Sequence, residues 1–236
     1  MIIQDKKHFT WGSLLTVTFF IALAYMFTPS FGGQNAFHAS DALFNSISKG
    51  SLSEYIPGLQ KQVTAWNGNS IDVNVKLKNP DYADKVKHVL DVAGAGASEA
   101  GERVNVKADL GSLLAATLQD SLDMFYNKGE ELQSRYGMDP KMVMYVWSQF
   151  YKGLENGLKG QKKFKEAALV SEVVKRGVEL SYNYYGVSPQ HAGDRAGILA
   201  FALIFYVVYT MWWGFAIFFL FEGIGLKMTK GKKKEM

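Results

Sequence analysis

Cysteine is absent from this chain of 236 residues. Its absence excludes disulfide bonds, zinc sites built on thiolates, iron–sulfur clusters and covalently attached haem. The sequence also lacks an Asn-x-Ser/Thr acceptor for N-glycosylation. Both absences agree with a bacterial protein, because large domains made in a secretory pathway usually carry disulfides and often carry N-linked glycans.

Motifs of the common hydrolases and nucleotide-binding proteins are absent as well. There is no His-Glu-x-x-His and no Gly-x-Ser-x-Gly, and the histidines are far apart in the sequence. Gly94, Gly96 and Gly101 follow a predicted helix and precede a predicted strand, whereas phosphate-binding loops run from strand to helix. We therefore interpret this stretch as a flexible connector, and we expect no enzymatic activity.

Formal charge is missing from one long stretch near the C-terminus. Residues 196–221, AGILAFALIFYVVYTMWWGFAIFFLF, contain no charged side chain. A helix of that length spans about 39 Å at ~1.5 Å per residue, whereas the hydrocarbon core of a bilayer is about 30 Å thick. A soluble core helix is rarely apolar on all sides over such a length, so we predict a transmembrane helix within residues 194–222.

A second uncharged stretch lies near the N-terminus, at residues 9–27. The basic start and the small residues Ala22 and Ala24 are also typical of a cleavable signal peptide. The apolar run, however, continues through that cleavage site to Phe27. We therefore favour an uncleaved transmembrane helix over residues 9–28, with the signal peptide as the alternative.

Lysines flank both apolar stretches on the sides facing the two chain ends. Lys6 and Lys7 precede the first, and five lysines follow the second. Positive charge gathers on the cytoplasmic side of membrane helices, and long loops cross regardless of their charge. We therefore expect residues 1–8 and the basic tail 223–236 to be cytoplasmic. The segment 29–193 is then expected outside the inner membrane, in the periplasm.

The basic excess does not indicate a nucleic-acid-binding protein. The formal net charge is +4, but residues 29–193 contain 18 Lys plus Arg and 18 Asp plus Glu. A nucleic-acid interface needs a basic face on the folded domain. We expect no nucleic acid among the partners, and we assign the excess to membrane lipid instead.

The segment between the apolar stretches predicts an α+β domain that is mostly helical. Apolar and polar residues alternate over 70–78 and over 103–108, which is typical of half-buried strands. A helical pattern from Asn79 to Ala93 lies between them, so the sequence predicts a small β-α-β sheet unit. Further helices are expected at residues 40–50 (capped by Ser40), 57–66, 109–136, from Pro140, and 162–185.

Two groups of side chains have the composition of metal ligands. The first shares one predicted helix face and contains Asp81, Asp84, His88 and Asp91. Carboxylates with a histidine bind hard or borderline divalent metals, and thioethers favour Cu(I). The second group consists of four methionines, whose thioethers could bind Cu(I): Met124, Met138, Met142 and Met144. A solvated helix face explains the first group and core packing the second, so we expect no metal and no cofactor.

The C-terminal apolar stretch carries polar aromatic residues near its middle, although tyrosine and tryptophan usually lie at membrane interfaces. Those whose spacing places them on one helix face are Tyr206, Tyr209, Thr210 and Trp213. In the N-terminal stretch, Gly12, Ser13 and Thr16 are small enough for another backbone to approach. We predict that these residues form a helix–helix interface, within the chain or with another subunit; tolerance of aromatic residues in lipid is the alternative.

These features favour a non-catalytic accessory subunit of a bacterial inner-membrane complex. Its partners would be other subunits or further copies of the chain. An extracytoplasmic ligand-sensing subunit that signals through a separate partner is the first alternative, because too few residues follow the second helix for an output domain. A membrane-tethered metal carrier or enzyme is the other alternative.

Overall fold

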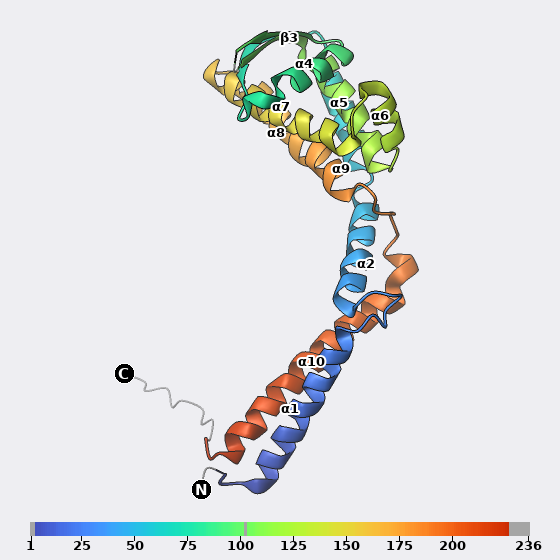
Figure 1. Cartoon of the computed structure of the whole chain (residues 1–236), viewed down its shortest axis with the longest axis vertical. Helices are drawn as coiled ribbons and strands as arrows, with labels where there is room; N and C mark the ends of the chain where they lie inside the picture. The colour runs from blue at the N-terminus through green and yellow to red at the C-terminus, as the bar shows by residue number, and fades with distance from the viewer. Residues whose placement is uncertain (1–2, 102, 227–236) are drawn as a thin grey trace, which may run out of the picture. The chain divides into compact units, whose positions relative to one another are not determined.

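The computed structural model describes residues 3–101 and 103–226, which form two compact units (Figure 1). The first, which we call the hairpin unit, combines the described residues within 1–47 and within 190–236. The second, which we call the core unit, contains residues 48–189. The fold is mostly helical with a small sheet, as the sequence predicts, and the sheet is antiparallel.

Two long apolar helices make up most of the hairpin unit. They are α1, Lys6–Met26, and α10, Ala196–Gly223, and both are long and apolar enough to cross a membrane. α1 begins where the Asp5 carboxylate accepts hydrogen bonds from two backbone N–H groups of the first turn, which a helix start would otherwise leave unpaired. The chain ends 1–2 and 227–236, including most of the predicted basic tail, lie outside the described residues.

α2, Ala36–Ser51, starts four residues earlier than the predicted cap at Ser40. Asn35 takes the capping role, because its side-chain oxygen accepts a hydrogen bond from the backbone N–H of His38 at 2.8 Å. Asparagine caps a helix as well as serine does. The prediction was wrong because two good capping residues lie close together and the chain uses the earlier one.

The core unit contains a three-stranded antiparallel sheet in the order β1-β3-β2. The strands are β1, Ser70–Lys76; β2, Gly96–Ala100; and β3, Arg103–Asp109. Val73 pairs with Val106 and Val75 with Val104. All four valines are buried, so the alternation seen in the sequence does mark the inward face of the sheet.

Two predictions were wrong at β2. The glycine-containing stretch expected to be a flexible connector includes this strand, and the sheet has three strands where the sequence predicted two. The helix α4, Ala83–Val92, does follow β1, but β2 and β3 form a hairpin after it, with Gly101 at φ +64° in the turn. The sequence of β2, GASEA, contains no β-branched or aromatic residue. It is a strand because β3 supplies its hydrogen-bonding partner, and tertiary context often overrides weak strand propensity.

The core unit contains further helices, of which some contact the sheet and the others pack against helices that contact it. They are α3, Tyr55–Thr64; η1, Pro80–Tyr82; α5, Leu110–Phe125; α6, Gly129–Tyr136; α7, Pro140–Gly160; α8, Phe164–Val173; η2, Val174–Val178; and α9, Glu179–Tyr184. The start of α7 at Pro140 agrees with the prediction, and the Asp139 side chain caps it.

Two predicted long helices are interrupted. The helix expected over 109–136 stops after α5, and Asn127 takes a left-handed conformation with φ 62° before α6 begins. The helix expected over 162–185 contains a π-helical turn, η2, between α8 and α9. Asparagine adopts positive φ more readily than most residues, so Asn127 permits the first break.

The hydrophobic core is organised by α7, which crosses the unit beneath the sheet in Figure 1. Its side chains Trp147, Phe150 and Tyr151 are fully buried. Trp147 also donates its indole N–H to the buried carboxylate of Asp120 at 2.9 Å, and Tyr136 donates its hydroxyl to the same carboxylate. The buried carboxylate is thus satisfied by hydrogen bonds, as buried polar groups in folded proteins usually are.

A buried lysine joins the two segments by which the chain enters and leaves the core unit. Lys49 is completely buried, and its Nζ donates to the carbonyl oxygens of Tyr184 and Val187 at 3.0 and 2.6 Å. It also donates to Oδ1 of Asn127 at 3.1 Å and lies 5.0 Å from the centre of the Phe125 ring. Burial lowers the pKa of Lys49. Lys49 therefore ties the end of α2 to the segment after α9.

Candidate membrane-helix interface

α1 and α10 lie side by side and run antiparallel (Figure 1). Two glycines, one in each helix, let the backbones approach closely. A Cβ atom on Gly12 would lie 2.6 Å from the backbone nitrogen of Leu220, and one on Gly223 would lie 2.6 Å from Cα of Phe9. Small residues at such crossings are typical of helix pairs in membranes, where close packing replaces the hydrophobic effect.

Aromatic rings fill the middle of the contact. Phe19 of α1 stacks on Tyr209 of α10 with ring centroids 4.3 Å apart, and its centroid lies 4.7 Å from that of Trp213. Phe20 meets Trp213 edge to face at 5.7 Å. Aromatic pairs at these distances contribute about 0.5–1.5 kcal/mol beyond the area they bury. The rings therefore hold the two helices together.

The predicted aromatic face of α10 is divided between two surroundings. Tyr209 and Trp213 contact α1, whereas Tyr206 is 68% exposed. Thr210 is exposed too, and its hydroxyl donates to the carbonyl oxygen of Tyr206 in its own helix. The four residues therefore do not meet one partner within the chain.

The small residues predicted on α1 also differ in their surroundings. Gly12 is buried against α10, in the position that a closely packed helix pair requires. The Thr16 hydroxyl donates to the carbonyl oxygen of Gly12 at 2.8 Å, so it satisfies itself within its helix. Ser13 is half-buried. Of the three, Gly12 makes the closest approach to α10.

The sequence analysis did not identify three residues of α10 that lie at this contact, namely Trp212, Ala216 and Gly223. Trp212 donates its indole N–H to the carbonyl oxygen of Leu15 at 3.1 Å, and Ala216 is completely buried. Together with Tyr209 and Gly223, these residues recur at intervals of three, four and seven, which places them on one helix face. Ala216 and Gly223 are small residues at helical spacing, which is the signal that would have identified this face.

Polar groups gather at the ends of the two helices that carry the chain termini. The His8 ring lies with Nδ1 2.6 Å from Oδ2 of Asp5 and Nε2 3.4 Å from Oε2 of Glu222. Hydrogen bonds from His8 lower the pKa of the Asp5 carboxyl. The backbone N–H groups of Gln4 and Asp5 both donate to the carbonyl oxygen of Gly223, at 2.9 and 3.1 Å. This end of the pair is therefore fixed by hydrogen bonds.

The hydroxyl of Tyr209 is buried inside the contact and has no hydrogen-bond partner among the described residues. Its ring lies between those of Phe19 and Phe205, with centroids 4.3 and 5.3 Å away. A buried hydroxyl without a partner costs roughly 1–3 kcal/mol. The ring of Tyr209 thus stabilises the contact, whereas its unpaired hydroxyl destabilises it.

The residues considered as metal ligands have other surroundings. His88 places Nε2 2.9 Å from the carbonyl oxygen of Tyr136, and Asp91 accepts a hydrogen bond from Lys87 at 2.6 Å. Within the part of the chain that the structure describes, no three His, Asp or Glu side chains are arranged to hold a metal ion. Met124 and Met144 are buried in the core. Met138 and Met142 pack against it.

No protein-family model, curated protein or solved structure matches this chain.

Proposed function

We propose that this chain is a non-catalytic accessory subunit of a bacterial inner-membrane complex. The hairpin of α1 and α10 anchors it in lipid, and the core unit serves as an interaction domain. The subunit carries no metal or cofactor and binds no nucleic acid. Its partners are other membrane subunits or a second copy of the chain.

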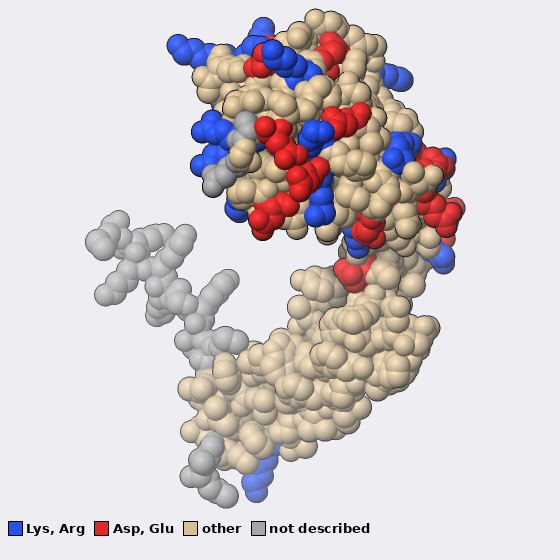
Figure 2. Space-filling view, turned by 45° about the horizontal axis from the view of Figure 1, so that its top comes forward, with Lys and Arg blue, Asp and Glu red and all other residues tan. Residues whose placement is uncertain are grey.

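The outward surface of the hairpin supports a membrane anchor. Phe201, Leu203 and Ile204 of α10 are each more than 60% exposed. In the most apolar 18-residue stretch of each helix, few residues are buried: 11% in α1 and 6% in α10. Leaving such side chains in water costs about 1.5–3 kcal/mol each relative to burial. Figure 2 supports the same proposal, because no charged side chain appears along the middle of these helices.

The fit between α1 and α10 argues that α1 is retained rather than cleaved as a signal peptide. A signal peptide needs only an apolar segment of the right length, without a matched partner. Gly12, however, is buried at a close approach to Leu220, and the Leu15 carbonyl accepts the Trp212 indole. Removing residues before a cleavage site at Ala24 would take away all of these contacts.

The antiparallel arrangement supports a topology with both termini in the cytoplasm. Hydrogen bonds from Gln4 and Asp5 to Gly223 hold the beginning of α1 beside the end of α10. Lys6, Lys7 and the lysine-rich tail then gather on one side of the membrane, as the positive-inside rule requires. Residues 29–193 are assigned to the periplasmic side.

The observation that carries the subunit proposal is the position of Tyr206. It lies about 5 Å along the helix axis from the midpoint of α10, at ~1.5 Å per residue, and it is 68% exposed. A tyrosine hydroxyl at that depth has no hydrogen-bond partner in lipid. We therefore assign the face around Tyr206 and Thr210 to a helix of another subunit.

Gentle detergent extraction, followed by mass spectrometry of co-purifying proteins, tests this proposal. The double variant Tyr206→Leu/Thr210→Ala should insert normally, since leucine is favourable in the bilayer, but should lose its partners or its larger size. Phe201→Leu/Phe215→Leu changes two other exposed aromatic residues of α10 and should keep them. Unchanged partners and size in the first variant would contradict the assignment, as would a wild-type protein that is a lone monomer.

A further inference from the structure

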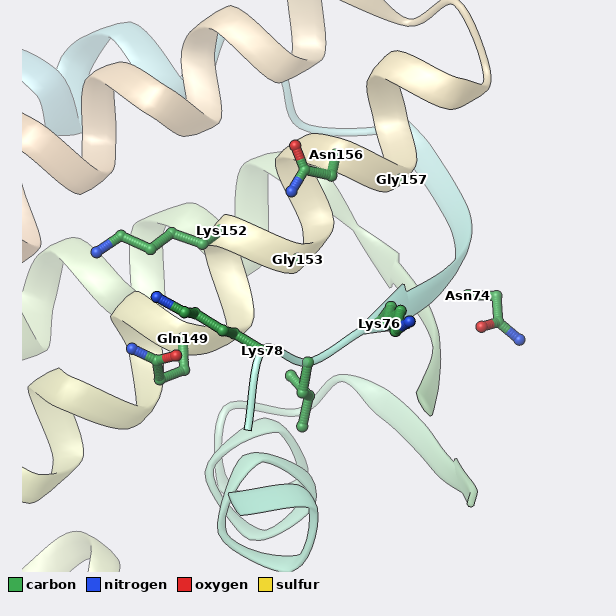
Figure 3. Close-up of a pocket in the computed structure, with 9 residues that line it drawn as sticks. Asn74, Lys76, Lys78, Gln149, Lys152, Gly153, Asn156 and Gly157 are labelled. Carbon is green, nitrogen blue, oxygen red and sulfur yellow. The ribbon is translucent and has the colours of Figure 1, made fainter. Parts of the chain in front are cut away.

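A groove in the core unit runs between the end of β1 and one side of α7 (Figure 3). Its volume is about 540 Å³. Three lysines and three residues with carboxamide side chains line it, together with two glycines and Leu77. The Asn74 carboxamide itself points away from α7 (Figure 3) and donates to Asn105 of β3. The six polar residues are Lys76, Lys78, Lys152, Asn74, Gln149 and Asn156. In the described part of the chain, no Asp or Glu lines this groove.

The two glycines of α7 explain how the groove is built. A Cβ on Gly153 would lie 2.6 Å from the carbonyl oxygen of Lys76, and one on Gly157 would lie 2.4 Å from Cγ1 of Val73. The Gln161 carboxamide donates to the carbonyl oxygen of Asp72 at 2.8 Å. β1 is therefore pressed against α7, and the groove has rigid walls on regular secondary structure.

The charge of the groove stands out against the rest of the segment. Residues 29–193 contain equal numbers of basic and acidic residues, 18 of each, yet the groove is lined by lysines alone among charged residues. Lys152 lies 3.4 Å from Glu179, but both side chains are over 40% exposed, and such pairs contribute little. The side chains of Lys78 and Lys152 extend toward the same end of the groove, beside Gln149 (Figure 3).

A second hollow of about 320 Å³ continues from that end, because it shares Gln149 and Lys152 with the first. Tyr145 and Tyr182 line it, with 39% and 38% of their surface exposed. Ser148, Asn183 and the carboxylate of Glu179 line it as well. The two hollows together form an elongated surface with Lys78 and Lys152 near its centre, and with two tyrosine rings and Glu179 at one end.

We propose that this surface binds an acidic glycan, whose carboxylate or sulfate group lies between Lys78 and Lys152. Carboxamide and hydroxyl side chains, which both donate and accept, suit the hydroxyl groups of sugars. An acidic peptide is less suited for two reasons. Gln161 and the close approach of Gly153 occupy the free edge of β1, so a peptide strand cannot add there.

The second reason is that the first hollow offers little apolar depth for a peptide side chain, since Leu77 is the one aliphatic residue among the described residues that line it. Met144 and Val178 line the second hollow. All the lining residues belong to the core unit. The proposal is therefore independent of the membrane role, and either can fail without the other.

Calorimetry on the full chain in nanodiscs of neutral lipid tests the proposal, with a galacturonic acid hexamer as the probe. Wild-type protein should bind the hexamer and should not bind neutral maltohexaose. Binding of the hexamer should be weaker at about 0.5 M salt, because salt screens the charges. Lys78→Gln/Lys152→Gln should weaken binding at least tenfold, because the loss of one charge-assisted hydrogen bond already costs about 1.4 kcal/mol, which is a factor of ten. Lys78→Arg/Lys152→Arg should retain it.

The control variant Lys61→Gln/Lys175→Gln removes the same charge from exposed lysines outside the groove and should bind as the wild type does. Absence of binding by the wild type, or equal affinity of the wild type and Lys78→Gln/Lys152→Gln, would overturn the proposal. A hexaglutamate peptide that binds as tightly as the glycan would overturn the choice of ligand and assign the groove to acidic peptides.

Discussion

Phe19 of α1 stacks on Tyr209 of α10, with ring centroids 4.3 Å apart and ring planes inclined by 21°. The two residues are far apart in the sequence, and their contact joins the predicted N-terminal and C-terminal membrane helices into one antiparallel pair. The hydroxyl of Tyr209 is buried in this contact without a hydrogen-bond partner among the described residues. The ring stabilises the pair, and the hydroxyl lowers that stability.

Tyr209→Phe keeps the ring and removes the unpaired hydroxyl. We expect the protein in mild detergent to unfold at the same temperature as the wild type or at a higher one, with a gain of up to about 1–3 kcal/mol. Phe19→Ala, which removes the stacked ring, should instead lower the unfolding temperature. Thermal unfolding followed by tryptophan fluorescence measures both. A clear loss of stability in Tyr209→Phe would mean that the hydroxyl has an acceptor.

Gly12 provides a test of the close approach between the helices. In Gly12→Ala, the new Cβ would lie 2.6 Å from the backbone nitrogen of Leu220, so the helices must separate. Overpacking of this kind costs about 1–3 kcal/mol. Gly214→Ala is the matched control, because nothing lies within 4 Å of a Cβ at that position of α10. Equal thermal stability of the two variants would contradict the packing described for α1 and α10.

The sequence predicted both apolar helices but not which face of α10 meets α1. Tyr206, Tyr209, Thr210 and Trp213 share a face by spacing, yet the contact is centred on Tyr209, Trp212 and Ala216. Helical periodicity groups residues into faces without telling which of two neighbouring faces is buried, when both are apolar. Backbone approach decides that choice, and it depends on where small residues of two distant segments coincide.

In the core unit, too, only part of the structure could be predicted from the sequence. The strands β1 and β3 were predictable because valines alternate with polar residues in both, whereas β2 has no such pattern and forms through pairing with β3. Lys49 was not predictable as a buried residue, since lysines are almost never fully buried. Its burial depends on carbonyl groups of a segment more than 130 residues later in the chain.

Lys49→Met should destabilise the core unit by about 2 kcal/mol near pH 7. The variant leaves the carbonyl oxygens of Tyr184 and Val187 without their buried donor, and an unsatisfied buried group costs about 1–3 kcal/mol. Urea unfolding of the full chain in detergent, followed by far-UV circular dichroism, measures this difference. A variant as stable as the wild type would contradict the clamping role of Lys49.

The same pair of proteins tests a dependence on pH. Burial lowers the pKa of Lys49 below its value of 10.5 in the unfolded chain, so the unfolded state binds more protons between those two pKa values. Stability therefore rises with pH through that window, because raising the pH discharges the ammonium in the folded state first. The free energy of unfolding should rise more steeply toward pH 10 in the wild type than in Lys49→Met. Parallel pH profiles would show that Lys49 has an ordinary pKa.

The topology of the chain is the most direct test of the proposed membrane subunit. Because the protein contains no cysteine, a single cysteine at Asn67 or at Lys234 reports its own side of the membrane. A membrane-impermeant maleimide added to intact spheroplasts should label Asn67→Cys at once, and should label Lys234→Cys only after the membrane is permeabilised. Labelling of Lys234→Cys with protection of Asn67→Cys, or equal labelling of both in intact spheroplasts, would contradict a hairpin anchor with residues 29–193 outside.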